Sequence, residues 1–243
     1  MSLDSSHKPH VVAQPWPLLL FVRHGESEAN ILRRISNRGF QHGLTEAGRG
    51  QAASLARKLQ PLSPSKLFSS PLRRAVETSQ ILSEELAVPY AITDALREYD
   101  CGIFEGRADD EAWRAYDQLS HRWMHGQEWA ARLPEGESLL EVKKRFVPFV
   151  DRLACSQDDG DETVVLVAHG GLYRFMLPLI LNNVDLPFAM ERPIGYTSVV
   201  EARWGDRGLL CHAWCGQGLE DRDPQPGETE IGHSETGKKA STP

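Results

Sequence analysis

Hydrophobic residues gather in two short runs, and each run ends on a histidine. Residues 18–22 and 163–168 are almost entirely apolar, which is typical of strands buried on both faces of a parallel sheet. An arginine and His24 follow the first run, and His169 follows the second. Ligands of open α/β sheets bind at the carboxyl ends of the strands, so we predict that the two histidines share one site.

The rest of the chain alternates between helical and strand patterns. Thr45 is typical of a helix N-cap, and apolar residues at the helical period follow it up to Pro61. Residues 66–69 predict a strand, and Ser70 and Pro71 predict the cap and first residue of the next helix. The remaining predicted elements are a strand at 89–92, helices at 138–153 and from residue 172, and a hairpin of residues 196–204 and 209–214. This order predicts an α/β domain.

Residues 109–129 fit this alternation less well. Helical spacing there is weak and runs through Trp113 and Tyr116. We therefore expect a small helical insertion over the active site, covering about residues 107–137.

Both ends of the chain lack the patterns of folded structure. Residues 1–15 mix polar residues and prolines without periodicity, and residues 216–243 carry almost no large apolar side chains. We expect a flexible N-terminus and a disordered tail on either side of one domain, residues 16–215.

The composition excludes several classes of protein. Of the 243 residues, 40% are hydrophobic and 25% are charged, as in ordinary globular proteins, and the formal net charge is −7. That charge argues against a general binder of nucleic acid or anionic membranes, and no apolar run approaches a membrane span. The four cysteines show no C-x-x-C spacing, and the nine histidines show no metal-ligand spacing. We expect a cytoplasmic protein with no nucleic-acid partner, no membrane contact, no metal and no cofactor.

Arginines lie beside both the first histidine and a neighbouring strand end. Arg23 precedes His24, while Arg73 and Arg74 fall in the first turn of a predicted helix, where cations oppose the helix dipole. A bound anion would offset that cost. Phosphate fits such a pocket, because its oxygens need donors and its phosphorus can be attacked by a neutral imidazole. Neighbouring arginines also lower the pKa of a histidine and so keep it neutral.

Several motifs occur in a fixed order between residues 18 and 174. They are Phe21-Val22-Arg23-His24-Gly25-Glu26-Ser27 with Asn30, Gly43-Leu44-Thr45-Glu46-Ala47-Gly48 with Gln51-Ala52, Ser69-Ser70-Pro71-Leu72-Arg73-Arg74-Ala75 with Thr78, Leu96-Arg97-Glu98, Pro134-Glu135-Gly136-Glu137-Ser138, and Val167-Ala168-His169-Gly170-Gly171. With these motifs the chain resembles the histidine phosphatase superfamily, which has the phosphoglycerate-mutase-like fold. The resemblance implies a three-layer α/β sandwich with a mostly parallel central sheet and helices on both faces.

The resemblance also implies roles for individual residues. His24 would be the nucleophile and form a phosphohistidine, and Glu98 would protonate the leaving oxygen and then activate water. A carboxyl group with that task needs a raised pKa. The catalytic candidates are His24, Glu98 and His169; the phosphate-binding candidates are Arg23, Asn30, Arg74, His169 and Gly170; the substrate-binding candidates are Arg34, Ser36 and Arg97.

The expected activity is metal-independent hydrolysis of a small-molecule phosphomonoester, with inorganic phosphate as a product. One alternative is a phosphoglycerate-type mutase, which needs a long basic insertion to keep its phosphohistidine dry. The insertion here is net acidic. The other alternative, a catalytically idle phospho-ligand binder, is disfavoured because every expected catalytic position is filled. A homodimer, the contributions of Arg73 and Arg174, and Glu105 as the acid in place of Glu98 stay open.

Overall fold

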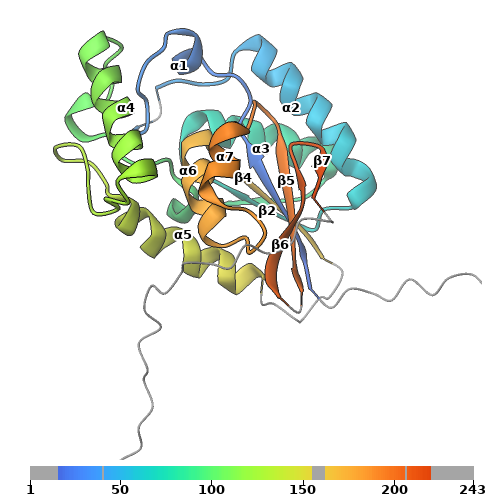
Figure 1. Ribbon diagram of the computed structural model, residues 1–243. Helices are drawn as coiled ribbons and strands as arrows, with labels where there is room; N and C mark the ends of the chain where they lie inside the picture. The colour runs from blue at the N-terminus through green and yellow to red at the C-terminus, as the bar shows by residue number, and fades with distance from the viewer. Residues whose placement is uncertain (1–15, 40, 155–161, 206, 220–243) are drawn as a thin grey trace, which may run out of the picture.

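A mostly parallel sheet of seven strands forms the centre of the part of the chain that the structure describes, in the order β3-β2-β4-β1-β5-β6-β7 (Figure 1). The computed structural model describes residues 16–39, 41–154, 162–205 and 207–219. Strands β1 to β4 pair in parallel, and β5, β6 and β7 add an antiparallel edge. The strands are β1 Leu18–Arg23, β2 Lys66–Ser69, β3 Tyr90–Ile92, β4 Thr163–Ala168, β5 Val199–Gly205, β6 Gly208–Trp214 and β7 Gln217–Gly218.

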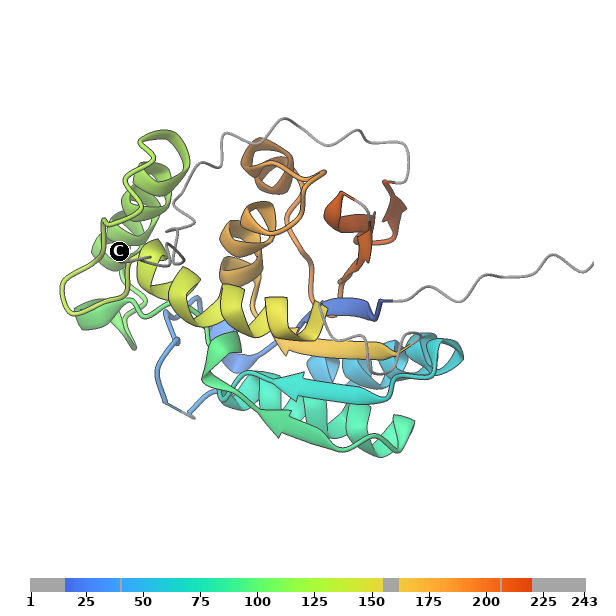
Figure 2. The same ribbon diagram turned by 90° about the horizontal axis from the view of Figure 1, so that it is seen from below.

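Helices cover both faces of the sheet, which confirms the predicted three-layer arrangement (Figure 2). Helices α2 and α3 pack on one face, and α5, α6 and α7 pack on the other. The α-helices are α1 Glu28–Ile31, α2 Glu46–Leu59, α3 Arg73–Leu86, α4 Asp110–His125, α5 Leu139–Ala154, α6 Gly170–Met176 and α7 Leu186–Glu191. The 3-10 helices are η1 Gln60–Leu62, η2 Asp94–Leu96, η3 Gly102–Phe104 and η4 Leu177–Leu179.

Strand β1 shows why the central strands are apolar along their whole length. Successive side chains of a strand point to opposite faces. Leu20 and Val22 therefore join the core beneath α2 and α3, while Leu19 and Phe21 join the core beneath α5 and α6. All four side chains are completely buried, and each stabilises the fold by roughly 1.5–3 kcal/mol relative to an exposed position.

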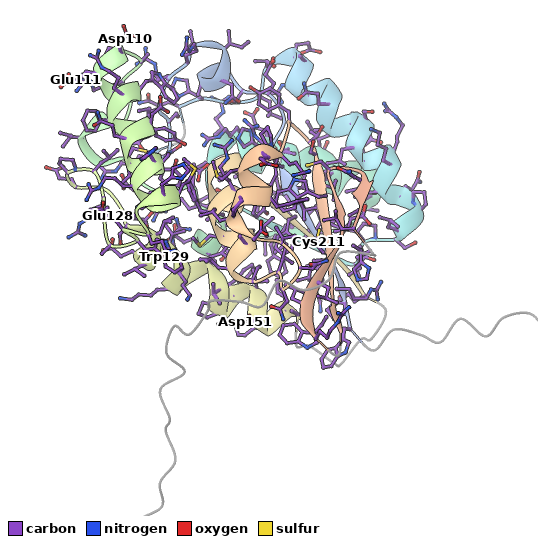
Figure 3. All side chains as sticks on the ribbon, in the orientation of Figure 1. Asp110, Glu111, Glu128, Trp129, Asp151 and Cys211 are labelled. Atoms are coloured by element: carbon purple, nitrogen blue, oxygen red, sulfur yellow. The ribbon has the colours of Figure 1, made fainter. Side chains whose placement is uncertain are left out.

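The predicted insertion is helix α4 and the loop that follows it. Asp109 caps the helix, and the acidic side chains of Asp110 and Glu111 in the first turn complement the helix dipole (Figure 3). At the other end, the buried Trp123 contacts Phe175 of α6 edge-on, with ring centroids 5.2 Å apart. Its Nε1 donates a hydrogen bond of 2.9 Å to the Ala131 carbonyl. These contacts hold α4 firmly against the sandwich.

The predicted start of α3 is wrong by two residues. The helix begins at Arg73 with Leu72 as its N-cap, whereas we expected Ser70 as the cap and Pro71 as the first helical residue. The Ser70 hydroxyl accepts the backbone N–H of Leu72 at 3.3 Å and so supports the turn just before the helix, while it also contacts His169 Nε2 at 2.6 Å.

Two boundaries in the C-terminal part also differ from the prediction. Helix α6 begins at Gly170 instead of Leu172, because His169 already serves as its N-cap. The prediction of disorder is wrong for residues 216–219, since β7 pairs with β6 and Leu219 is only 9% exposed. The predictions for residues 1–15 and 220–243 fall outside the described residues. Within the described ranges, none of the helices is both long and apolar enough to cross a membrane.

Candidate active site

A cavity of about 240 Å³ lies where β1, β2 and β4 end. The parallel pairing of these strands brings their carboxyl ends together, and the residues that follow each strand line the cavity. Eight of the ten residues predicted from the sequence line it: Arg23, His24, Asn30, Arg34, Ser36, Arg74, Glu98 and Gly170. The structure therefore gathers residues that are up to 147 positions apart in the chain, from Arg23 to Gly170.

His24 is held in a single orientation by hydrogen bonds on both ring nitrogens. Nδ1 lies 2.6 Å from the carbonyl oxygen of Gly25, which can only accept, so Nδ1 carries the hydrogen. Nε2 lies 3.0 Å from Arg74 Nε, which can only donate, so Nε2 presents its lone pair. The imidazole is thus fixed as the tautomer in which Nε2 is nucleophilic.

The surroundings of His24 also keep it uncharged. The side chain is only 3% exposed, and this burial lowers its pKa well below the usual 6.5. The charges of Arg74 and Arg23 lower the pKa further. At pH 7 the ring is neutral, and its Nε2 lone pair is available for attack on an electrophile.

Two buried nitrogen atoms beside His24 lack a partner among the described residues. Arg23 Nε is one of them, although Arg23 Nη1 donates to the Ile194 carbonyl at 2.8 Å. His169 Nδ1 is the other, and the ring of His169 lies 5.2 Å from that of His24. Both atoms are therefore free to hydrogen-bond with a group that binds beside His24.

His169 contacts Ser70. The Ser70 hydroxyl accepts the backbone N–H of Leu72 at 3.3 Å and lies 2.6 Å from His169 Nε2, to which it can donate and from which it can accept. Burial lowers the pKa of His169 well below its usual value, with a further contribution from Arg74, so the ring is neutral. His169 is completely buried and lies behind the cavity wall instead of lining it.

Arg74 is the most constrained cation of the site. It is 6% exposed, and besides His24 it contacts the Ser36 carbonyl, to which Nη1 donates at 2.6 Å. Burial lowers the pKa of Arg74 from 12.5 to about 10, so the group is still a cation at pH 7. Its neighbour Arg73 points away and forms an ion pair with Glu77 at 2.7 Å. Of the two arginines, Arg74 therefore lines the cavity and Arg73 does not.

Glu98 is held at the other side of the cavity by backbone N–H groups. Its Oε2 accepts from Gly171 at 3.0 Å, and its Oε1 accepts from Tyr99 at 3.2 Å. Burial raises the pKa of Glu98 above the usual 4.5, against the opposing effects of Arg74 and of these two N–H groups. A Cβ at position 171 would lie 2.7 Å from Glu98 Oε2, so the carboxyl group keeps its place because residue 171 is glycine.

Glu105, the alternative acid, has a different setting. Its Oε2 accepts the backbone N–H groups of Asn37 at 2.8 Å and Arg38 at 3.1 Å, and its Oε1 accepts that of Cys101 at 3.2 Å. It does not line the cavity. Glu105 therefore ties two loops together, and Glu98 is the carboxyl group of the site.

The three remaining polar candidates in the cavity lie on the loop that follows β1. Asn30 Oδ1 accepts from the hydroxyl of Ser27 at 2.8 Å, which leaves the amide NH₂ of Asn30 as its free donor. Arg34 Nη1 donates to the Gly106 carbonyl. The Ser36 hydroxyl contacts Nδ1 of His42 at 2.8 Å.

The structure does not bring Arg97, a predicted substrate-binding residue, into the cavity. Its guanidinium is turned away from the cavity and forms ion pairs with Asp94 at 2.8 Å and Glu137 at 2.9 Å. The position next to Glu98 suggested proximity, but consecutive residues of an extended segment point in opposite directions.

Sequence reasoning missed the side chains that α4 contributes. Trp113, Tyr116 and Ser120 of α4 line the cavity, and Arg174 of α6, whose contribution the sequence left open, lines it as well. The spacing of the three α4 residues, i, i+3 and i+7, is the signature of one helix face and was a detectable signal. What it could not show is that this face meets the site and not solvent.

The cavity carries positive charge from guanidinium groups. Four arginines line it, and Glu98 is the one carboxyl group among the lining residues. In the described part of the chain, no cluster of three or more His, Cys, Asp or Glu side chains could hold a metal ion. The arrangement can therefore bind a small anion and expose it to a neutral imidazole.

Comparison with known proteins identifies the family. A model of the histidine phosphatase superfamily (branch 1) matches residues 19–216. The chain is 33% identical to a glucosyl-3-phosphoglycerate phosphatase from Mycolicibacterium vanbaalenii, over 68% of this chain and 74% of that protein. It is 31% identical to a probable phosphoglycerate mutase, GpmB, from Yersinia pestis, over 70% of this chain and 76% of that protein. The structure of a mycobacterial glucosyl-3-phosphoglycerate phosphatase in complex with VO3 is 27% identical and has a TM-score of 0.69, over 83% of this chain and 100% of that chain. The chain therefore belongs to branch 1 of the histidine phosphatase superfamily, as one of its phosphatases.

Proposed function

We propose that this phosphatase hydrolyses small-molecule phosphomonoesters without a metal ion, through a phosphohistidine on Nε2 of His24. The observation that carries the proposal is the state of His24: a buried, neutral imidazole with Nδ1–H fixed on the Gly25 carbonyl and the Nε2 lone pair among guanidinium groups. Such a group is an activated nucleophile for phosphorus.

In the first step, His24 Nε2 attacks the phosphorus and the bond to the leaving oxygen breaks. Arg74 and the free Nε of Arg23 donate to the phosphoryl oxygens, and they supply the charge stabilisation that a metal ion gives in other phosphatases, while the buried His169 lies beside His24. Glu98, whose raised pKa favours the protonated form, gives its proton to the leaving alcohol.

In the second step, water replaces the alcohol. The Glu98 carboxylate takes a proton from this water, and the oxygen attacks the phosphorus. The bond between phosphorus and Nε2 breaks, His24 returns to its neutral form, and inorganic phosphate leaves. Each group thus ends the cycle in the protonation state in which it began.

The relatives support a small phosphorylated substrate. A mycobacterial phosphatase of similar fold has been solved with inorganic phosphate, 27% identical with a TM-score of 0.66. The cavity of about 240 Å³ suits a ligand of modest size. Our proposal includes a cytoplasmic location, supported by the acidic composition and the scattered cysteines.

The test is to trap the intermediate. A steady-state reaction with nitrophenyl phosphate, quenched in base and followed by mass analysis, should place one phosphoryl group on His24, and mild acid should remove it. His24→Ala should show no label, while the matched variant His42→Ala should still be labelled. A phosphoryl group on Ser27 or Cys101 would refute this mechanism. Incubation with EDTA should leave the rate unchanged.

A further inference from the structure

The turn that leads into β5 lies against the carboxyl end of β1. Its residues 194–198 follow α7 in the chain, and the antiparallel pairing of β5 with β1 brings them beside Arg23. The Arg23 N–H donates to the Ser198 carbonyl at 3.2 Å, and the Thr197 N–H donates to the Arg23 carbonyl at 3.0 Å. This turn is therefore in place to control where the Arg23 side chain points.

Two groups of the turn fix the Arg23 guanidinium. The ring of Tyr196 lies against it, with Arg23 Cζ 4.4 Å from the ring centroid, which is within the range of a cation–π interaction. The carbonyl oxygen of Ile194 accepts a hydrogen bond of 2.8 Å from Nη1. Gly170 of α6 is also close, because a Cβ there would lie 3.2 Å from Arg23 Nε and 3.3 Å from Cζ. The guanidinium thus has little room to tilt or turn.

These contacts leave one edge of the guanidinium for a ligand. Nε is buried and has no partner, and Nη2 makes no hydrogen bond with any residue that the structure describes. Nε and Nη2 carry parallel N–H bonds, the arrangement in which a guanidinium binds two oxygens of a phosphate. Arg23 lines the cavity and Tyr196 does not. An effect of Tyr196 on a bound phosphoryl group would therefore pass through Arg23.

The ring of Tyr196 also compensates for the burial of a cation. Burial lowers the pKa of Arg23 from its usual 12.5, because the charge loses contact with water. Arg23 forms no ion pair within the described part of the chain. The negative face of an aromatic ring attracts a cation most strongly where water is excluded. The ring thus stabilises the charged guanidinium before a phosphoryl group arrives.

The backbone of the turn is strained at the residue next to Tyr196. Thr197 has a φ of 53°, in the left-handed region that a β-branched residue rarely adopts. Such conformations persist where the surrounding structure enforces them, and they are frequent at functional sites. Tyr196 itself belongs to neither hydrophobic cluster of the fold, although the half-buried Tyr90 and Tyr116 pack against these clusters. The turn is thus held in a costly conformation that places Tyr196 on Arg23 and not in the core.

We propose that Tyr196 is a positioning residue of the phosphatase: its ring holds the Arg23 guanidinium in the orientation in which Nε and Nη2 bind the phosphoryl oxygens. This inference rests on the proposed function, in which Arg23 binds those oxygens. A preorganised donor stabilises the transition state more than a mobile one. Tyr196 therefore contributes to the rate from outside the cavity.

The first test removes the aromatic ring. Tyr196→Leu should lower kcat/KM for nitrophenyl phosphate by roughly 2- to 30-fold, the range of a cation–π interaction. Inorganic phosphate should inhibit this variant more weakly by a similar factor, because Arg23 binds the same oxygens in the product. Tyr196→Phe keeps the ring, and the Tyr196 hydroxyl makes no hydrogen bond with a described residue, so this variant should recover nearly all of the loss. Tyr196→Met replaces Tyr196→Leu if that variant does not fold.

A double-mutant cycle shows whether Tyr196 acts through Arg23. In an Arg23→Gln background, which has no cation over the ring, Tyr196→Leu should cause no further loss. In a Glu98→Gln background it should cause the full loss, since Glu98 acts on the leaving oxygen. Tyr90→Leu is the matched control, because Tyr90 is half-buried like Tyr196 but lies on the edge strand β3, outside the cavity. It should leave kcat/KM and phosphate inhibition unchanged.

Three results would overturn the inference: unchanged kinetics in Tyr196→Leu, an equal loss in Tyr196→Phe, or an undiminished effect of Tyr196→Leu in the Arg23→Gln background. Calorimetry of inorganic phosphate binding needs no turnover and separates this inference from the proposed function. If His24 is not labelled but phosphate binding still weakens in Tyr196→Leu, the mechanism is wrong and the role of Tyr196 holds. If His24 is labelled and phosphate binding is unchanged, only the role of Tyr196 is wrong.

Discussion

Replacing Arg74 with methionine should abolish most of the activity. Arg74 Nε lies 3.0 Å from the nucleophilic nitrogen of His24, so the guanidinium is already in place when a phosphoryl group arrives. Removal of one preorganised donor from such a site typically costs about 10²- to 10³-fold in kcat, or about 2.7–4 kcal/mol. We expect a loss of this size for nitrophenyl phosphate.

The same substitution should change the free energy of unfolding by less than about 2 kcal/mol. At pH 7, below the pKa of Arg74 in both states, the cation is present in folded and unfolded chains. The pKa of Arg74 falls from the usual 12.5 to about 10 in the folded chain. Folding therefore disfavours the charged form of Arg74 by about 3 kcal/mol. Methionine removes this penalty but leaves the Ser36 carbonyl without its donor, a loss of about 1–3 kcal/mol. The two effects nearly cancel.

Steady-state kinetics and urea unfolding of the same preparations would test both statements. Arg73→Met is the matched control, because Arg73 lies in an exposed ion pair with Glu77 that contributes less than about 1 kcal/mol. It should keep both activity and stability. Full activity in Arg74→Met would show that our assignment is wrong. A loss of more than about 4 kcal/mol in stability would attribute the inactivity to unfolding.

Three further predictions concern the acid, the two histidines and the acceptor. Glu98→Gln should lose about 10²- to 10⁴-fold with alkyl phosphates and much less with nitrophenyl phosphate, whose leaving group needs no proton; an equal loss on both would make Glu98 structural. Folding lowers the pKa values of His24 and His169, so the unfolded chain binds more protons than the folded chain below pH 6.5. The free energy of unfolding should therefore fall by about 1.4 kcal/mol per histidine and pH unit as the pH drops from 6.5. Urea titrations in which the free energy of unfolding of His24→Gln changes with pH as steeply as that of wild type would contradict this. With 3-phosphoglycerate and catalytic 2,3-bisphosphoglycerate, phosphate release should outrun isomerisation, because α4 and its loop are net acidic and do not form the basic enclosure that a mutase needs; the reverse ratio would favour a mutase.

The sequence alone determined the architecture and the central residues of the site. Two apolar runs that end on His24 and His169 predict buried parallel strands, and parallel strands end at one edge of a sheet. Strand periodicity is a local property, and so is the change from apolar to cationic residues at Arg23. For this reason both strands and the convergence of their histidines were predictable.

Only the tertiary structure decided which side chains around those histidines face the cavity. Arg74 lines the cavity and Arg73 does not, because consecutive residues of helix α3 point to different faces of the helix. Arg97 is drawn away by Asp94 and by Glu137, which is 40 residues distant in the chain. Contacts of this kind depend on how elements pack, and no local pattern records them.

That Arg174 has no hydrogen-bond or ion-pair partner among the described residues also depends on how the elements pack. Its position after His169 is visible in the sequence, but the absence of an acceptor among the described residues depends on how α4, α6 and the loop after β1 enclose the cavity. The lowered pKa values of the histidines and the raised pKa of Glu98 likewise come mainly from burial, which is a property of the folded chain. The sequence thus supplied the reacting groups, and the packing around them set their charge and their orientation.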